Sequence, residues 1–302
     1  MQTLDPKVTL GTLVLNSFDL YGKCFTCESV PEMLSSPPVR SSQTPRQGGH
    51  GVYDSLSQYG ARTLPFEGVL LARTPEERLE MEWALKRYLT LSALQDYATS
   101  DGYVLVKIEL EDGTLMQCYA KIASAVQFFY REESPGRHMM RGFRFSMVAK
   151  DPNLYSQTLK TESGGETYAG TNFQVIQGVS PTVPSQLYSL TPLTATCENL
   201  GTSDAPPVIT ITGPTTSPKV TNVTTGKFIE LTGLTLGNGE SVTIDVSRGS
   251  IELEDGTDVS AYWGSGSDWW VLIPGENEIT LLDGNPSLIG ATAEISWRDV
   301  WL

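Results

Sequence analysis

The chain has 302 residues, of which 39% are hydrophobic and 19% are charged, and its formal net charge at neutral pH is −14. This length and apolar content suit two ordinary domains and argue against a disordered tail. Four cysteines are too few for a disulfide scaffold, the apolar run Thr9–Leu15 has no basic leader, and no stretch reaches transmembrane length. We therefore expect a protein that folds in a reducing cytoplasm and has no membrane partner.

The negative charge is concentrated in the second half of the chain. Residues 1–152 carry 16 basic and 18 acidic side chains, a net −2, whereas residues 153–302 carry 5 and 17, a net −12. An acidic surface repels phosphate backbones. The composition therefore argues against nucleic-acid binding by charge neutralisation in the second half.

The first half opens with two apolar stretches, residues 7–16 and 20–30, which we expect to form a β-hairpin that turns at Asn16 and Ser17. Residues 31–50 are rich in Pro, Ser, Gln and Gly and contain too few apolar side chains to order themselves by burial. This stretch is predicted to be a long loop. In an oligomer, such loops commonly reach a neighbouring subunit.

A change of hydrophobic period marks the one helix that we expect in this half. Residues 61–71 follow strand spacing, and a strong helix start comes after them. Thr74 offers an N-cap hydroxyl, Pro75 suits the first turn, and Glu77 occupies the capping-box position. The helix is predicted over residues 75–89, with an apolar stripe that packs on a sheet or at an interface.

The clearest β-hairpin of the first half is Gly102–Tyr119, in which apolar and polar residues alternate around the turn Asp112-Gly113. Residues 125–130 and 142–148 are expected to be its partner strands. Asp151-Pro152 should end the last of them, because proline cannot donate a hydrogen bond to a neighbouring strand.

Three regions follow from these patterns. Residues 1–156 are predicted to form the first domain, and residues 157–193, rich in Thr, Ser, Gly and Pro, a linker or extended arm. Residues 194–302 contain short β-segments at spacings of about 8 to 12 residues, which is typical of a β-sandwich or jelly roll. The expected strands there are Ala195–Leu200, Val208–Gly213, Lys219–Asn222, Phe228–Leu231, Ser241–Asp245, Ser250–Leu253, Trp269–Leu272, Glu278–Leu281 and Thr292–Trp301. The predicted fold class is mainly β, with an α+β first domain and a β-sandwich second domain.

The second half also carries a series of motifs in order: Asn199–Thr202, Ala205–Gly213, Asn222–Gly226, Ile244-Asp245, Trp269–Ile279 and Ile295–Leu302. In that order and spacing they resemble the carboxyl-terminal domain of the siphophage distal tail proteins, the ring components that join a long non-contractile tail tube to the baseplate. The first half is similar to the same family in its opening strands, the long loop, the segment Tyr59–Arg62, the capped helix and the Asp112-Gly113 hairpin. The resemblance spans nearly the whole chain and depends on the order of the motifs, since each motif alone is weak.

The resemblance implies a structural virion protein at the tip of a phage tail, assembled in the host cytoplasm, and not an enzyme. An amino-terminal belt domain would close a hexameric ring around a lumen through which DNA passes without specific binding. A galectin-like sandwich would face adaptor or receptor-binding proteins, and the tail tube protein and the tail hub or tip protein would be neighbours. We expect the loop 31–50 with His50, together with Arg62 and Trp83, to lie at or near subunit contacts. A fragment that ends near Ser156 should still assemble.

No catalytic residue, metal site or cofactor is expected. Cys24 and Cys27 have the only metal-like spacing, but no second pair accompanies them, and on a strand they point to opposite faces. We interpret them as one buried and one half-buried thiol. Both histidines, His50 and His138, lie in turn-like contexts and are interpreted as surface residues. The acidic run 252–258 lacks the ligand pattern of an EF-hand loop and is interpreted as a solvated hairpin tip.

Trp263, Trp269 and Trp270 support a second hypothesis, because sugar-binding sandwiches stack pyranose rings on exposed aromatic side chains beside carboxylates such as Asp268. The alternative is packing between sheets, and strand geometry would place one of the adjacent Trp269 and Trp270 inside and the other outside. A carbohydrate-binding adhesin that recognises host cell-wall glycan is therefore the alternative function. A glycoside hydrolase ranks third, since no paired carboxylates stand out.

Overall fold

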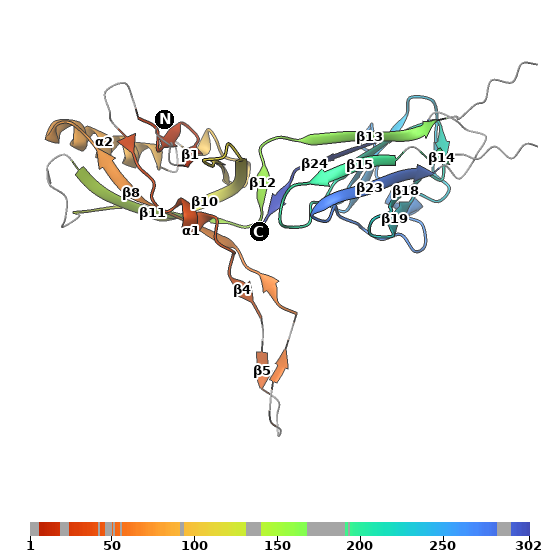
Figure 1. Cartoon of the computed structure of the whole chain (residues 1–302), viewed down its shortest axis with the longest axis horizontal. Coiled ribbons are helices and arrows are strands. Elements are labelled where there is room, and N and C mark those ends of the chain that lie inside the picture. The colour runs from red at the N-terminus through yellow and green to blue at the C-terminus, as the bar shows by residue number, and fades with distance from the viewer. Residues whose placement is uncertain are drawn as a thin grey trace, which may run out of the picture. The chain divides into compact units, whose positions relative to one another are not determined.

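Figure 1 shows the computed structural model of the chain. It describes residues 6–18, 24–41, 43–45, 50, 52–54, 56–90, 94–130, 140–167, 191–192, 194–282 and 291–302. The chain forms two compact units: unit 1 is Met1–Thr158 with Trp301–Leu302, and unit 2 is Leu159–Val300. Strands dominate both units, so the prediction of a mainly β chain is confirmed. Within the described ranges, no helix is long and apolar enough to cross a membrane.

Unit 1 is built on one large antiparallel sheet with the strand order β2-β1-β9-β10-β11-β8-β3. The short strand β12 pairs with β10 at the side of this path. The longest strand, β10, shifts register after Ile122 and again after Ser124, so it bends along its length. The bounds are β1 Lys7–Leu10, β2 Leu13–Leu15, β3 Cys24–Phe25, β8 Arg62–Leu71, β9 Val104–Glu109, β10 Leu115–Phe129, β11 Met140–Ala149 and β12 Leu154–Ser156.

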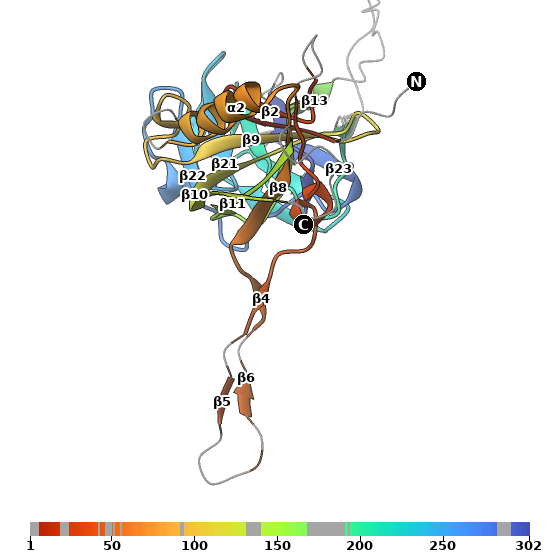
Figure 2. The ribbon, with the colours of Figure 1, turned by 90° about the vertical axis from the view of Figure 1, so that its left-hand side faces the viewer.

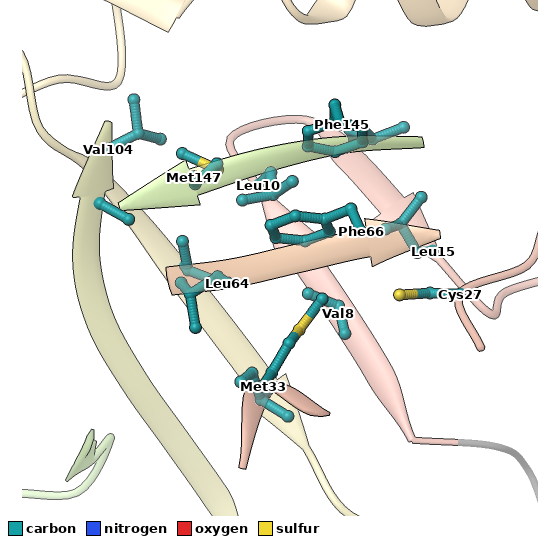
Figure 3. Close-up of a cluster of buried hydrophobic side chains, with 14 of the residues drawn as sticks. Val8, Leu10, Leu15, Cys27, Met33, Leu64, Phe66, Val104, Phe145 and Met147 are labelled. Atoms are coloured by element: carbon teal, nitrogen blue, oxygen red, sulfur yellow. The ribbon is translucent and has the colours of Figure 1, made fainter. Parts of the chain in front are cut away.

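One face of this sheet carries the core of unit 1, because strand residues with alternating burial send every second side chain to the same side. Figure 3 shows Leu64 and Phe66 of β8 beside Phe145 and Met147 of β11, with Met33 approaching from the short helix α1 (Val30–Met33). The rings of Phe66 and Phe145 stack with 4.5 Å between their centroids.

The second helix, α2 (Pro75–Tyr88), confirms the predicted helix and its start. The Thr74 hydroxyl accepts a hydrogen bond from the backbone amide of Glu77 at 3.2 Å, and the Glu77 carboxylate accepts one from the amide of Arg73 at 3.1 Å. Met81 and Leu85 on its inner face are buried against the sheet. Local residues therefore fix where α2 begins, and burial fixes which side faces inward.

The opening hairpin is shorter than predicted. β1 pairs with β2 around Gly11, whose φ of +55° suits a glycine turn, and β3 pairs with β8. Asn16 is therefore not the tip of a hairpin. Its buried side chain bridges to Cys27, accepting from the backbone amide at 2.6 Å and donating to the carbonyl at 3.0 Å.

The stretch predicted as a long loop also contains regular structure. After α1, two short strands run outward and two return, so that β4 pairs with β7 and β5 with β6. Figures 1 and 2 show this ladder as an extension that leaves the body of unit 1. We call residues 39–59 the arm; its strands are β4 Val39–Arg40, β5 Gln43–Pro45, β6 Val52–Asp54 and β7 Gln58–Tyr59.

Unit 2 contains a six-stranded sheet, β14-β13-β24-β16-β21-β22, a four-stranded sheet, β15-β23-β18-β19, and a small pair, β17-β20. Buried and exposed residues alternate along both large sheets, as in a β-sandwich. The bounds are β13 Lys160–Thr167, β14 Thr191–Pro192, β15 Thr194–Asn199, β16 Val208–Thr212, β17 Thr215–Thr216, β18 Lys219–Asn222, β19 Lys227–Glu230, β20 Thr235–Leu236, β21 Ser241–Asp245, β22 Ser250–Leu253, β23 Gly275–Leu282 and β24 Thr292–Trp297, with a 3-10 turn η1 Ser260–Tyr262. A final short strand is β25 Val300–Trp301.

Three sequence expectations for this half need correction. Residues 160–167, expected in the linker, form β13, which pairs with β24 along six residues from Lys160 to Gly165. Residues 168–190 of the expected linker lie outside the described part of the chain. The predicted strand Thr292–Trp301 is interrupted at Arg298-Asp299, and Trp269–Leu272 is not a strand.

Buried asparagine side chains explain why the stretch around Trp270 is fixed without belonging to a ladder. Asn277 accepts from the amide of Ile273 at 3.0 Å and donates to its carbonyl at 2.8 Å. The carbonyl of Leu272 accepts from the Asn199 side chain at 3.1 Å, and that of Val271 from Asn222 at 3.3 Å. All three asparagines are fully buried, and their amides add to the single backbone bridge between Leu272 and Ala205.

Candidate interaction surfaces

The arm of unit 1 is exposed along the residues whose burial is described. Every arm residue whose exposure is described is exposed, including Val39 at 61%, Leu56 at 90% and Tyr59 at 46%. An isolated two-stranded ribbon is only marginally stable in water. The described residues of the arm therefore present apolar side chains to solvent and not to a core of unit 1. His50, predicted at a subunit contact, is an exposed residue of this arm.

Arg62, also predicted at or near a subunit contact, is buried at the root of the arm. The side chain is only 1% exposed, so it is no part of the surface of the unit. Nη1 donates to the carbonyls of Met33 at 2.9 Å and Ser35 at 2.6 Å, and Nε donates to the carbonyl of Pro152 at 2.6 Å. Burial lowers the pKa of the guanidinium from its ordinary value. Arg62 thus ties the segment before β4 to the body of the unit.

The root is closed by a second contact. The backbone amide of Gly60 donates to the carbonyl of Pro38 at 2.6 Å, just below the paired strands β4 and β7. Together with the bonds of Arg62, this fixes both strands of the arm where they leave the unit. Arg62 therefore anchors the root of the arm, and its expected place at or near a subunit contact stays a prediction.

Trp83, the third predicted contact residue, lies on the outer face of α2. It is 62% exposed, and Leu79 one turn earlier is 49% exposed. The ammonium of Lys86 lies 6.0 Å from the centre of the Trp83 ring and 5.4 Å from that of Phe128 on β10. A large aromatic side chain on the solvent side of a helix contributes nothing to its own core, so its position fits contact with another molecule.

The aromatic residues singled out in unit 2 divide into two roles. Trp270 is fully buried, while Trp269 beside it is 39% exposed, as the alternation of inside and outside predicted. Trp269 packs against Trp263 with 4.5 Å between ring centroids and an angle of 31° between planes. Asp268 next to this pair is exposed. The pair is a small aromatic surface with a carboxylate at its edge.

The cysteines offer no reactive or metal-binding chemistry. All four are buried and none forms a disulfide; Cys24 and Cys27 are both buried, so the expectation of one half-buried thiol was wrong. Burial raises the pKa of Cys118 and of Cys197 to about 12, which keeps both thiols protonated at neutral pH. The described residues contain no group of three or more His, Cys, Asp and Glu side chains that could hold a metal ion. His138 and the rest of the segment 131–139 lie outside the described residues.

Residues 200–301 match the family model described as the C-terminal domain of the siphovirus-type tail component. Unit 2 belongs to this family. The resemblance that the sequence showed in this half of the chain is therefore confirmed. A search of the curated proteins gave no match.

One solved structure shares the fold over nearly the full length of the chain. The SPP1 Dit protein (gp 19.1), described as a paradigm of the hub adsorption apparatus in phages that infect Gram-positive hosts, matches with a TM-score of 0.59 and 13% identity, covering 98% of this chain and 99% of that one. Chains of the phage P2 baseplate in its activated conformation match at 10% identity with Ca and 11% with Sr, with TM-scores of 0.39 and 0.37, covering 96% of this chain and 97% of theirs.

The sequence motifs of this domain stabilise its fold. Gly201 passes so close to the backbone of Val300 that a Cβ atom would overlap the Val300 carbonyl, and Ser203 pairs with the same residue. The Asp299 carboxylate is 5% exposed, accepts from the Lys160 ammonium at 2.9 Å and from the amide of Leu200 at 3.0 Å. These residues fix the connection between β24 and the loop after β15, so the motifs identify the fold and do not form a reactive site.

Proposed function

We propose that this protein is a tail component that forms a hexameric ring at the distal end of a long non-contractile tail, where it joins the tail tube to the baseplate. Unit 1 makes the contacts between copies, and the ring encloses a lumen through which DNA passes. Unit 2 is an acidic docking surface for adaptor or receptor-binding proteins. The protein acts by assembly and has no enzymatic step.

The arm is the observation that carries this proposal. It is anchored at its root by Arg62 and Gly60, it presents Val39, Leu56 and Tyr59 to solvent, and its strands pair only with each other among the described residues. A ribbon of this kind gains stability when a neighbouring copy covers it. A contact in which one copy reaches the next without reciprocity is heterologous, and heterologous contacts close into rings when the rotation allows.

Native mass and negative-stain imaging of the full chain test the proposal. We expect closed sixfold rings with six times the 33.0 kDa mass of one chain. A matched variant replaces residues 41–57 by Asn-Gly, which keeps the β4–β7 pair and closes it with a two-residue turn. This variant should fold with unchanged thermal stability of unit 2 and fail to form rings. A wild-type chain that stays monomeric at high concentration would refute the ring, and rings formed equally well without the arm would refute its role.

A carbohydrate-binding adhesin is the alternative function, because the Trp263–Trp269 pair exposes an aromatic face beside Asp268. Titration with fragments of host cell-wall glycan separates the two hypotheses. The adhesin hypothesis requires a monomer that binds glycan. Glycan affinity should be lost in Trp269→Ala and reduced in Trp263→Ala. The docking role of unit 2 requires wild-type rings and no glycan binding that depends on Trp269.

A further inference from the structure

Two arginines of unit 1 share a single carboxylate. Arg78 and Glu82 lie one turn apart on α2, and Nη1 of Arg78 donates to Oε1 of Glu82 at 2.6 Å. Nε of Arg141, on β11, lies 3.8 Å from the same oxygen atom. We call Arg78 and Arg141 the arginine pair; their side chains are 19% and 17% exposed, and that of Glu82 is 12% exposed. One carboxylate therefore neutralises one of two positive charges that are largely removed from water.

The arginine pair has more hydrogen-bond donors than acceptors. Nε of Arg78 and both Nε and Nη1 of Arg141 are fully buried, and among the described residues none accepts a hydrogen bond from them. Buried polar groups nearly always have a partner, and a guanidinium binds a carboxylate through two parallel hydrogen bonds. Nη2 of Arg141 is not among the fully buried atoms and donates to none of the described residues. An acceptor can therefore approach this guanidinium at Nη2.

The flank of α2 that carries the arginine pair is positive as well. Lys86 follows Glu82 by one turn, and its ammonium lies 5.4 Å from the ring centre of Phe128 on β10. Each residue advances about 100° around a helix, so the remaining acidic residues of α2 lie about 120–160° from Glu82. These residues are Glu76, Glu77 and Glu80. The acidic side of α2 thus faces away from the arginine pair.

The neighbouring strands add no acidic side chain to this flank. β10 and β11 contain none. β8 contains one, Glu67, which pairs with Arg144. Arg144 and Arg141 are three positions apart on one strand, so they point to opposite faces of the sheet. Around the arginine pair, the described part of these elements therefore places three basic side chains, Arg78, Lys86 and Arg141, beside one acidic side chain, Glu82.

Exposed apolar side chains border the arginine pair. Leu79 and Trp83 are 49% and 62% exposed, and each follows one member of the ion pair on α2 by one position. Tyr130, directly after β10, is 64% exposed, and its ring centre lies 3.7 Å from Cζ of Arg141. A nucleic-acid backbone or a small anion gains little from contact with Leu79 and Trp83, whereas an apolar side chain of a protein does. This combination favours a protein segment as the source of a second carboxylate.

We propose that the arginine pair binds a carboxylate side chain of another protein, beside which an apolar side chain packs on Leu79 and Trp83. The carboxylate accepts hydrogen bonds at the edge of Arg141 that includes Nη2, and it supplies the second negative charge that the two guanidiniums require. The contact depends on charge, so an uncharged amide of the same shape does not replace the carboxylate. This inference rests on the proposed place of the chain in an assembly, because a partner protein has to supply the carboxylate.

Hydrogen exchange of the full chain tests the site with acetate as the probe, measured by mass spectrometry on peptides from α2. A ligand that binds only the closed site slows exchange through opening by the factor 1 + [L]/Kd. We expect about 200 mM sodium acetate to slow exchange roughly fivefold or more relative to the same concentration of sodium chloride. The two solutions screen charges equally, and only acetate matches the planar guanidinium. Peptides from β22 in unit 2 should show no difference.

Variants separate binding from a structural effect. Arg141→Gln should abolish the effect of acetate. Glu82→Gln should increase it, because the two arginines then have no carboxylate of their own, and a folding defect would not produce an increase. Arg144→Gln, exposed on the opposite face, is the matched control and should respond as the wild type does. Equal exchange in acetate and chloride for the wild type and Glu82→Gln, or an acetate effect that survives in Arg141→Gln, would overturn the site.

Two tripeptides with blocked ends, Leu-Glu-Leu and Leu-Gln-Leu, test the protein partner, because they differ only in the central charge. The glutamate peptide should slow exchange at a concentration about tenfold lower than acetate, and the glutamine peptide should have no effect. Trp83→Ala should reduce the glutamate peptide to the level of acetate. Sodium phosphate that acts at a lower concentration than the glutamate peptide would overturn the protein partner. A larger acetate effect in Glu132→Gln combined with Glu133→Gln would overturn it too, because the chain itself would then supply the carboxylate.

Ring formation is a separate measurement, so the two proposals can fail independently. If native mass shows rings and the α2 peptides exchange equally in acetate and chloride, the carboxylate site is refuted and the ring stands. If the chain stays monomeric while acetate and the glutamate peptide slow exchange, the ring is refuted and the carboxylate site stands.

Discussion

Replacement of Arg62 by methionine should destabilise unit 1 severely, although a side chain of similar length fills the space. Three backbone carbonyls, those of Met33, Ser35 and Pro152, lose their donor in a site where the side chain is 1% exposed. Each buried acceptor left without a partner costs about 1–3 kcal/mol, and relief from burying a charge offsets part of the sum. We expect a net loss of about 4 kcal/mol, which is a large part of the roughly 5–15 kcal/mol that stabilises a typical domain.

Urea unfolding followed by hydrogen exchange of peptides from β8 to β11 measures this loss in unit 1 alone. At about 1.4 kcal/mol for each factor of ten, exchange that requires global opening should speed up by roughly 10³. Arg62→Lys keeps the charge but cannot span three carbonyls from separate segments, so it should lose less. The exposed Arg144→Met on β11 is the matched control and should stay within about 0.5 kcal/mol of the wild type. A loss below about 1 kcal/mol for Arg62→Met would refute the anchoring role.

Three further predictions concern sites that have no part in the proposed contacts. Asn277→Ala should lower the free energy of unfolding of unit 2 by about 2–4 kcal/mol, because the buried side-chain amide bonds the backbone of Ile273. Urea unfolding followed by tryptophan fluorescence measures this loss. A loss no larger than that of a substitution at an exposed position would contradict the prediction. Thr74→Ala should cost unit 1 about 1 kcal/mol and Thr74→Ser much less, by thermal unfolding. Burial raises the pKa of Cys118 from 9.0 to about 12, so the folded state binds the thiol proton more tightly than the unfolded state does. The stabilisation that results is complete below pH 9, and the free energy of unfolding should decline between pH 9 and 12. This decline should disappear in Cys118→Ala when unfolding is measured across that pH range.

The features that follow from neighbouring residues were predictable from the sequence. The start of α2 depends on Thr74, Pro75 and Glu77, which lie within four positions of one another. The turn at Asp112-Gly113 likewise needs only a glycine with positive φ, observed at 86°, and a side chain that accepts from the amide of Thr114 at 2.9 Å. Such local chemistry does not depend on the rest of the fold.

The errors occur where distant parts of the chain decide the structure. The stretch Trp269–Leu272 has the apolar content of a strand, but side chains from Asn199 and Asn222, far away in sequence, take up its carbonyls. Residues 31–50, which include the first strands of the arm, were expected to be a loop because they contain few apolar residues. The strands of the arm nevertheless pair with each other without a core. Period and burial patterns identify elements that pack on a core, so they miss a ribbon that pairs in solvent.

Arg62 illustrates the same limit for the candidate contacts. An arginine in a polar segment is usually exposed, and nothing within a few residues of it indicates the carbonyl of Pro152, 90 positions later. Trp83 was predicted at a subunit contact. The structure places its side chain on the exposed face of α2, and the contact itself stays a prediction. The bounds of a helix can thus be predicted from neighbouring residues, whereas the exposure of a single side chain can be predicted only with the tertiary fold.

The division of the chain into units has a consequence for engineering. The polypeptide leaves unit 1 after Thr158 and re-enters it at Trp301, whose ring packs against the first core. Unit 2 is thus an insertion, bounded by two junctions in the host domain. A fragment truncated at Ser156 would lack the indole that completes its core, whereas excising residues 159–300 and bridging the ends would keep it. Exchange of unit 2 for another module therefore requires the replacement of an internal segment, joined to unit 1 at both ends.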